Sequence, residues 1–344
     1  MSDALDLAAA LQRSVRGSQL SRGEAREVFA NAVSGSVDPV QLGGLLASMA
    51  TRGESAAEIA GAVDALRAAM VPFEHAHSDA IDTCGTGGDG LGLVNLSTAA
   101  AVVAAAAGAH VVKHGNRALS SQCGSADVLE AAGVRVELSP RAARDVLDEV
   151  GITFLFAPLY HPALRAAAPV RRSLGVRTIF NLLGPLLNPG RVRRQLLGVG
   201  DPARVEQFAA VLRDLGHERV LVVHGAGGAD ELTLAGENAV AAIGFERAPG
   251  LDALHAGLAS APIESLRGGD KVRNVAAIRA ALSGELGPIA DAIALNAAAA
   301  LLVAGVEREL APALARAKES LANRSALERL ERWASLSQRV EGAR

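Results

Sequence analysis

The amino-acid sequence predicts an α/β protein in which a small all-helical domain lies beside a larger α/β domain with a mostly parallel central sheet flanked by helices. Three observations support this fold class. The chain has 344 residues, more than one minimal core requires. Up to about residue 70, apolar side chains recur at helical spacing without a strand pattern. From about residue 79, short apolar runs alternate with helical segments, as in a parallel sheet with crossover helices.

The helical domain is predicted over residues 1–70, and it carries no cluster of ligand-type side chains. Two helix starts can be recognised by capping boxes, in which a serine precedes a glutamate by three positions. The first pairs Ser21 with Glu24, and the second pairs Ser55 with Glu58. We expect this domain to be helical throughout and to serve as an oligomer interface.

The α/β domain is predicted over residues 79–344. Strands are expected at 80–84, 110–113, 134–138, 152–156, 195–199, 220–223 and 239–243, and helices at 97–107, 125–132 and 141–150. Pro202 suits the first turn of a helix that follows Asp201. The segment 160–189 breaks the alternation because it contains four prolines and four arginines. We expect it to form short helices and ordered turns that pack on the helical domain.

The composition excludes several classes of protein. The net charge is −3 and aromatic residues make up 3%, which argues against nucleic acid as the main partner. The longest apolar runs are shorter than the roughly 20 residues of a membrane span, and no secretory signal precedes the helices. The chain has two cysteines, Cys84 and Cys123, too few for a disulfide framework. We therefore expect a cytoplasmic protein with reduced thiols and no membrane partner.

A glycine-rich loop, C-G-T-G-G-D-G at 84–90, follows the first predicted strand of the α/β domain. Gly85, Gly87 and Gly90 have the spacing of a dinucleotide-binding loop, but Lys113 stands where such a site needs an acidic residue. The sequence G-K-S/T occurs nowhere, which excludes a Walker A loop. What remains is a loop whose backbone N–H groups can converge on an anion.

Further groups suited to anions follow this loop. Asn95, Ser97 and Thr98, together with free N–H groups at the start of the next helix, predict a second anion cradle. Lys113 adds a positive charge. A third group consists of hydroxyl side chains, of which the last is expected to cap a helix: Ser120, Ser121 and Ser125. Three such elements predict a small-molecule ligand with more than one phosphate.

A ligand with several phosphates usually brings Mg²⁺, which requires oxygen ligands. Asp230 and Glu231 are the best candidates in this chain. They follow the predicted strand at 220–223 and the flexible glycines after it, so we expect them at the carboxyl edge of the sheet.

At this point the motifs resemble those of the anthranilate phosphoribosyltransferase family, within the nucleoside phosphorylase and phosphoribosyltransferase fold. The first half carries G-T-G-G-D at 85–89, N-L-S-T at 95–98, K-H-G-N-R at 113–117 and G-S-A-D-V-L-E at 124–130. The second half carries V-R-R-S-L-G-V-R-T at 170–178, F-N-L-L-G-P-L-L-N-P at 180–189 and D-E-L at 230–232. The resemblance covers nearly the whole chain, and the combination of motifs is specific.

The resemblance implies transfer of a phosphoribosyl group from 5-phosphoribosyl 1-pyrophosphate to the amino group of anthranilate, with release of pyrophosphate. It implies a homodimer formed through the helical part. The residues that it implies for phosphoribosyl pyrophosphate are Gly85, Gly88, Asp89, Asn95, Leu96, Ser97, Thr98, Lys113, Ser121 and Ser125. Those that it implies for anthranilate are Gly85, His114, Asn116, Arg171 and Pro185. It implies two Mg²⁺ ions per subunit, held by Ser97, Asp230 and Glu231.

No covalent nucleophile is expected. The neutral aromatic amine is already nucleophilic, so catalysis would rest on positioning and on electrostatic stabilisation of the leaving pyrophosphate, with His114 as the one candidate for a further role. The guanidinium of Arg171 matches a carboxylate through two contacts.

Three alternatives compete with this interpretation. A pyrimidine nucleoside phosphorylase usually has Lys-His-Ser before the glycine loop, and this chain lacks it. A non-enzymatic nucleic-acid-binding relative would have a basic groove and would have lost Asn116 or Arg171. Phosphoribosyl transfer to another aromatic amine stays open. The chain also departs from the family at Leu93 and Val94, where a hydroxyl residue and phenylalanine are usual, and at Lys271.

Overall fold

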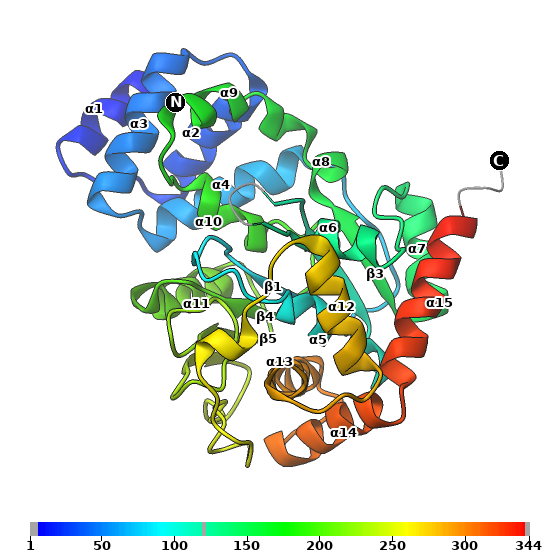
Figure 1. Ribbon diagram of the computed structural model, residues 1–344. Coiled ribbons are helices and arrows are strands. Elements are labelled where there is room, and N and C mark those ends of the chain that lie inside the picture. The colour runs from blue at the N-terminus through cyan, green and yellow to red at the C-terminus, as the bar shows by residue number, and fades with distance from the viewer. Residues whose placement is uncertain (1–5, 119–121, 341–344) are drawn as a thin grey trace.

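The computed structural model describes residues 6–118 and 122–340. Four helices form the N-terminal part: α1 (Leu7–Val15), α2 (Arg22–Ser34), α3 (Pro39–Arg52) and α4 (Ala56–Ala69). They lie together at one end of the molecule (Figure 1). Both predicted capping boxes are present, at the start of α2 and of α4. No helix of the described ranges is long and apolar enough to cross a bilayer.

Six strands in the described part of the chain form one sheet: β1 (Ile81–Gly85), β2 (Val111–Gly115), β3 (Ile152–Phe156), β4 (Arg194–Gly198), β5 (Arg219–His224) and β6 (Ala239–Ile243). Their order is β3-β2-β1-β4-β5-β6. All neighbouring strands are parallel except β6, which pairs antiparallel with β5. The prediction of a mostly parallel sheet is therefore confirmed.

The prediction of a strand at 134–138 is wrong. Val134, Val136 and Leu138 are buried and the residues between them are exposed, as in a strand. The backbone nevertheless joins none of the six strands in the described ranges, and the N–H of Arg135 donates to Oγ of Ser337 at 2.9 Å in helix α15 (Ser325–Arg339). The alternation reflects packing of an extended segment on helices, so a period of two did not by itself indicate a sheet.

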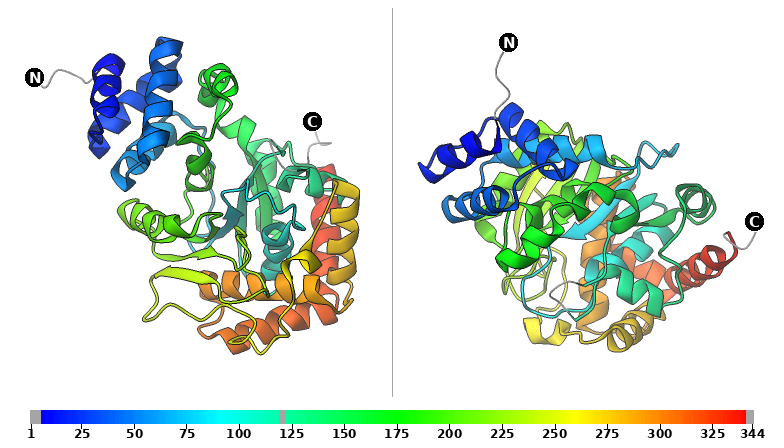
Figure 2. Two further views of the ribbon diagram at one scale, coloured as in Figure 1. Left: turned by 60° about the vertical axis from the view of Figure 1, so that its left-hand side comes forward. Right: turned by 90° about the horizontal axis from the view of Figure 1, so that it is seen from above.

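Helices cover both faces of the sheet. One face packs on α5 (Leu96–Ala106), α7 (Pro140–Val150) and α13 (Pro288–Ala304). The same apolar core extends outward to α6 (Ser125–Ala131), α12 (Lys271–Leu282), α14 (Leu310–Ala322) and α15. The other face packs on α11 (Val205–Asp214) and shares its apolar core with α2, α3 and α4. Pro202 opens a short 3-10 turn, η3 (Pro202–Arg204), that leads into α11. The N-terminal and C-terminal helices thus lie on opposite sides of the sheet (Figure 2).

The segment 160–189 consists of short helices and turns, as predicted: α8 (Ala157–Tyr160), η1 (Pro162–Arg165), α9 (Ala168–Leu174), α10 (Phe180–Leu183) and η2 (Gly184–Leu186). It packs on the N-terminal helices. The ring of Phe180 lies edge-on to that of Phe29 in α2, with 5.8 Å between centroids. A Cβ on Gly43 in α3 would touch Val170 in α9 at 3.6 Å. The inserted helices are therefore attached to the N-terminal part by apolar contacts.

The capping glutamate Glu58 is fully buried and joins three parts of the helical domain. Its carboxylate accepts hydrogen bonds from the backbone N–H of Leu20 and of Ser55, both at 2.9 Å, and it pairs with Arg52. Burial alone would raise the pKa of Glu58, but Arg52 and the two N–H donors outweigh it and hold the pKa below its ordinary value. The carboxylate form of Glu58 is therefore part of the folded state.

We expect Glu58→Gln to lower the free energy of unfolding by about 3 kcal/mol at pH 7, because it breaks a buried ion pair and leaves Arg52 unpaired. Urea denaturation measures this loss. Glu24→Gln is the matched control, since Glu24 fills the same capping position but pairs with Arg13 near the surface. That change should cost roughly 1 kcal/mol or less.

The same pair predicts a pH dependence. Because the folded-state pKa of Glu58 is lowered, its contribution is complete above the unfolded value of about 4.3 and is lost as the pH falls towards the folded value. The difference in stability between wild type and Glu58→Gln should therefore be constant from pH 7 to 5 and shrink below pH 4. A difference that stays constant down to pH 3 would contradict this assignment.

Candidate functional site

A cavity of about 410 Å³ lies at the carboxyl ends of the central strands. Its walls come from the loop after β1, the start of α5, the end of β2, the segment 160–189 and the turn that contains Asp230 and Glu231. The chain continues from β1 to β2 on one side, whereas β4 lies on the other side of β1. The cavity therefore occupies the point where the strand order switches, which is where open α/β sheets bind ligands.

Most of the residues predicted for the site line this one cavity: Gly85, Gly88, Asp89, Asn95, Ser97, Thr98, Lys113, His114, Asn116, Ser125, Arg171, Pro185, Asp230 and Glu231. Leu93 and Val94 line it as well. Leu96, the first residue of α5, does not line the cavity, because its side chain is fully buried in the apolar core. Ser120 and Ser121 lie outside the described residues. The structure thus brings together residues that are up to 146 positions apart, from Gly85 to Glu231.

Two glycines at strand ends make room for the acidic turn. A Cβ on Gly198, at the end of β4, would lie 1.7 Å from the backbone oxygen of Asp230, and a Cβ on Gly85 would lie 2.2 Å from its Oδ2. Either would force the turn away from the sheet. The N–H of Gly87 donates to Oδ2 of Asp230 at 2.5 Å, which attaches the turn to the glycine loop.

The glycine loop is held from its far side by Arg177. The guanidinium donates to the backbone oxygens of Gly87 and Gly88, each at 2.9 Å. Both glycines have positive φ angles, +70° and +72°, which residues with a Cβ seldom adopt. The shape of the loop therefore depends on glycine and on a side chain from the segment 160–189.

Three carboxylates crowd one end of the cavity. Burial raises the pKa of Asp230 well above its ordinary value, and the charges of Glu231 and Asp89 raise it further. Burial also raises the pKa of Glu231, against a hydrogen bond from the Ser97 N–H and the charge of Lys113. Oxygen donors that repel one another in this way suit a small divalent cation such as Mg²⁺, which would offset the repulsion.

The prediction of free N–H groups at the start of α5 is wrong. The N–H of Ser97 donates to Oε1 of Glu231 at 3.0 Å, and those of Leu96 and Thr98 donate to backbone carbonyls. The acidic turn thus occupies the donor that was assigned to an anion. The Thr98 hydroxyl is buried without a hydrogen-bond partner among the described residues, so it can serve a ligand.

Ser125 is not the cap of α6. The cap position is Gly124, whose N–H donates to the carboxylate of Asp127 at 2.8 Å, and Ser125 is the first helical residue. Its hydroxyl donates to the backbone oxygen of Asn116 at 3.4 Å. Asp127, three positions after Gly124, caps the helix in place of Ser125. The Ser125 side chain lines the cavity.

Beneath the cavity, Lys113 is almost completely buried, and its ammonium group donates to the backbone oxygen of Thr83. The neighbouring Asp82 accepts a hydrogen bond from Asn188 at 2.9 Å. Burial raises the pKa of Asp82 to about 6, although the charge of Lys113 opposes this. Sequence reasoning missed Asp82 and Asn188. A charged residue within the apolar strand A-I-D-T-C was the available signal.

Another part of the cavity wall combines the Arg171 guanidinium with neutral rings. Burial lowers the pKa of Arg171, and no neighbouring charge among the described residues contributes to that shift. Its guanidinium carbon lies 5.1 Å from the ring centre of Phe180. This part of the wall therefore presents a guanidinium beside an aromatic ring, which suits a ligand that is itself aromatic and carries a carboxylate.

His114 and His161 lie side by side here, with ring centres 5.1 Å apart. Burial lowers the pKa of His114 to about 3, helped by His161, and burial lowers the pKa of His161 to about 4. Both rings are therefore neutral at pH 7. The Nε2 atom of each is buried without a partner among the described residues. The position of His161 at the cavity was not predicted from the sequence.

Comparison with known proteins gives matches over the whole length. The model of the glycosyl transferase family, helical bundle domain, matches residues 8–70, and that of the glycosyl transferase family, a/b domain, matches residues 77–327. Anthranilate phosphoribosyltransferase of Roseiflexus sp. (strain RS-1) is 48% identical over 332 residues, which are 95% of this chain and 97% of the relative. That of Rhodopseudomonas palustris (strain ATCC BAA-98 / CGA009) is 45% identical over 339 residues, 97% and 99% of the two chains.

Solved structures agree with the fold. The crystal structure of anthranilate phosphoribosyltransferase from Thermus thermophilus superposes with a TM-score of 0.90 at 46% identity, and covers 96% of this chain and 99% of its own. The Saccharomyces cerevisiae enzyme in complex with PRPP and Mg superposes with a TM-score of 0.89 over 96% and 98% of the two chains, but at 24% identity it supports the fold alone.

Proposed function

The chain belongs to the anthranilate phosphoribosyltransferase family, and from this premise we propose that it transfers the phosphoribosyl group of 5-phosphoribosyl 1-pyrophosphate to the amino group of anthranilate. The products are N-(5-phosphoribosyl)anthranilate and pyrophosphate, in a step of tryptophan biosynthesis. The observation that carries the proposal is a single cavity lined both by a carboxylate cluster and by a guanidinium beside neutral rings. Such a cavity suits a phosphorylated donor and an aromatic acid acceptor at once.

The donor end of the proposed complex lies at the glycine loop and the acidic turn. We assign phosphoribosyl pyrophosphate to Gly85, Gly88, Asp89, Asn95, Ser97, Thr98, Lys113 and Ser125, which all line the cavity. The unpartnered hydroxyl of Thr98 supports this assignment, because a buried donor needs an acceptor such as a phosphate oxygen.

We propose that Mg²⁺, two ions per subunit, is held by Asp230, Glu231 and Ser97. The crowding of carboxylates supports this, since burial and then the charges of Glu231 and Asp89 raise the pKa of Asp230. When bound, Mg²⁺ supplies a positive charge that stabilises the leaving pyrophosphate. The chain itself positions these carboxylates: the N–H of Gly87 donates to Asp230 and the N–H of Ser97 donates to Glu231, and both side chains line the cavity.

The acceptor end is assigned to His114, Asn116, Arg171 and Pro185. Arg171 would bind the carboxylate of anthranilate, because a guanidinium offers two parallel donors to it. In the reaction a bond forms between the amine nitrogen and C1 of the ribose, the bond from C1 to the pyrophosphate oxygen breaks, and one amine proton leaves to water. His114 has a pKa of about 3, so at pH 7 it can position the amine by a hydrogen bond but cannot act as an acid.

The test is the decay of anthranilate fluorescence when the purified protein is mixed with phosphoribosyl pyrophosphate and Mg²⁺. We expect rapid decay that a chelator abolishes. The double variant Asp230→Asn/Glu231→Gln should behave like the chelated enzyme, and excess Mg²⁺ should restore little of its rate. Decay that proceeds unchanged with chelator would remove Mg²⁺ from the proposal. No decay with anthranilate, but turnover with another aromatic amine, would change the acceptor.

A second prediction separates the two ends of the cavity. Arg171→Ala should raise the KM for anthranilate by about tenfold to a hundredfold, because a pair of charge-assisted hydrogen bonds is lost. The KM for phosphoribosyl pyrophosphate should change little. Arg172→Ala is the matched control, because Arg172 is adjacent, exposed and outside the cavity. Equal increases in both KM values after Arg171→Ala would contradict the assignment.

We further propose that the chain acts in the cytoplasm as a homodimer formed through its helical part. Two exposed valines there support an interface, Val15 in α1 and Val40 in α3, with 68% and 82% of their surface accessible. Light scattering should give twice the chain mass of 35.1 kDa, and a single chain mass at micromolar concentration would exclude the dimer.

A further inference from the structure

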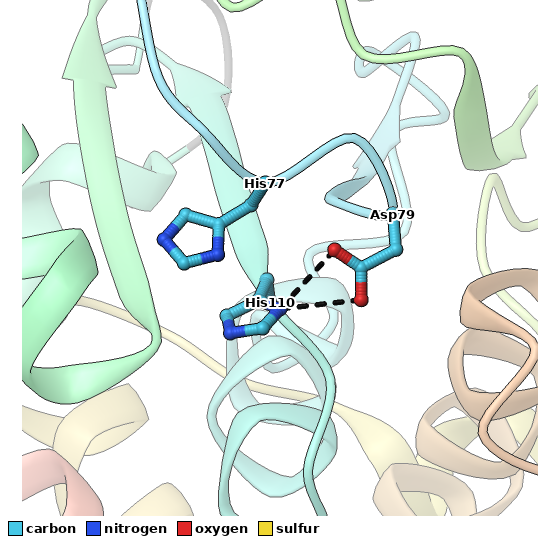
Figure 3. A group of neighbouring side chains, drawn as sticks. All are labelled: His77, Asp79 and His110. Carbon is cyan, nitrogen blue, oxygen red and sulfur yellow. Dashed lines mark hydrogen bonds and ion pairs between the residues drawn. The ribbon is translucent and has the colours of Figure 1, made fainter.

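A second cluster of ligand-type side chains lies at the other end of the sheet from the cavity. It consists of His77, Asp79 and His110, and it is shown in Figure 3. Asp79 precedes β1 and His110 precedes β2, so both stand at the amino ends of strands whose carboxyl ends face the cavity. We propose that this cluster binds a zinc-type divalent metal ion.

The backbone holds the three residues in place without any ligand. Ile81 and Val111 are paired neighbours in β1 and β2, and the N–H of Ile81 donates to the backbone oxygen of His110 at 2.9 Å. A turn closes between the N–H of Ala80 and the backbone oxygen of His77 at 3.1 Å. Two adjacent strand starts and one tight turn therefore bring the side chains to one point, as a preformed metal site requires.

The donor atoms suit zinc. One ligand atom from each residue lies within 4.8 Å of the others, and Nδ1 of His110 lies 3.3 Å from both carboxylate oxygens of Asp79. The rings of His77 and His110 have their centres 4.0 Å apart. Zinc bonds of about 2.0 Å place tetrahedral ligand atoms roughly 3.3 Å apart. Asp79 and His110 already have this spacing, and side-chain rotation would bring the other ligand atoms, which lie within 4.8 Å, to it. Two imidazoles and one carboxylate leave a fourth position for water.

A fourth residue orients one of the imidazoles. Nε2 of His77 lies 2.8 Å from Oδ1 of Asp148 in α7, and a carboxylate can only accept this hydrogen. In the neutral ring the proton then lies on Nε2, and Nδ1 keeps its lone pair. By the same argument Nδ1 of His110 carries a proton towards Asp79, which the metal ion would displace on binding. Figure 3 shows one ring nitrogen of His77 directed towards His110 and the other directed away from the cluster. A carboxylate that fixes the far nitrogen of a metal-binding histidine is the usual arrangement around zinc.

The consequence is structural. Residues 70–80 connect α4 to β1, and two hydrogen bonds hold this connector to other parts of the chain. The N–H of Val71 donates to the backbone oxygen of Tyr160 at 2.8 Å, and Nε2 of His75 lies 3.0 Å from the backbone oxygen of Gly190. A metal ion at His77, Asp79 and His110 would clamp this connector to the sheet and, through Asp148, to α7. Because the carboxyl ends of the strands are elsewhere, the ion would raise stability and take no part in phosphoribosyl transfer.

The test uses the full chain after treatment with a chelator. Zn²⁺ is titrated against a chromophoric chelator in excess Mg²⁺, which occupies the carboxylates at the cavity. We expect one Zn²⁺ per chain and a rise in the thermal unfolding midpoint. His110→Ala and His77→Gln should lose both effects, and Asp148→Asn should weaken Zn²⁺ binding about tenfold. The matched control is His255→Ala, because His255 is exposed and its Nδ1 contacts only one carboxylate, Oδ2 of Asp252 at 2.8 Å.

Far-ultraviolet circular dichroism checks that each variant is folded, and Asp79→Asn provides a ligand change of nearly equal size if an alanine variant unfolds. Absence of Zn²⁺ uptake by the wild-type chain would overturn the proposal. The same stoichiometry and affinity in wild type, His110→Ala and Asp79→Asn would also overturn it, because the ion would then bind elsewhere. Loss of binding in these variants with retention in His255→Ala supports it.

Discussion

The close approach of one acidic turn to two strand ends determines the site. The backbone oxygen of Asp230 lies where a side chain on Gly198 would begin, and its carboxylate lies where one on Gly85 would begin. Only glycine leaves this space, so the ends of β1 and β4 form a floor for the turn. Since the strand order switches between β1 and β4, the same contact places the carboxylates at the crevice of the sheet. The glycine loop, the start of α5 and the cavity are all arranged around that turn.

The turn also determines which groups are left for ligands. In the structure, N–H groups of Gly87 and Ser97 already bind the carboxylates of Asp230 and Glu231. These donors partly offset the cost of burying acidic groups that repel each other. A cation between the carboxylates would take over that task. If a metal ion and an anion bind at this loop as proposed, both would act on the same hydrogen bonds.

The part of the cavity around Arg171 depends on a different constraint, the packing of the segment 160–189 on the helical part. Phe180 touches Phe29 on one side and lies near Arg171 on the other. Arg177 from the same segment holds the glycine loop by its carbonyl groups. The segment therefore connects the helices to the loop, and both ends of the cavity are shaped by contacts between parts of the chain that are distant in sequence.

The sequence by itself determined the local features: the two capping boxes, the glycine loop, the alternation of strands and helices, and most of the predicted site residues that the structure brings to one cavity. These depend on short-range spacing or on motifs, which a single chain displays directly. Only the tertiary structure decided which N–H groups stay free, why Gly198 must be glycine, that His161 faces the cavity, and that residues 134–138 pack on helices instead of joining the sheet. Each of these depends on a contact with a residue far along the chain, such as Glu231 on Ser97 or Ser337 on Arg135. Spacing within the sequence carries no information about such contacts.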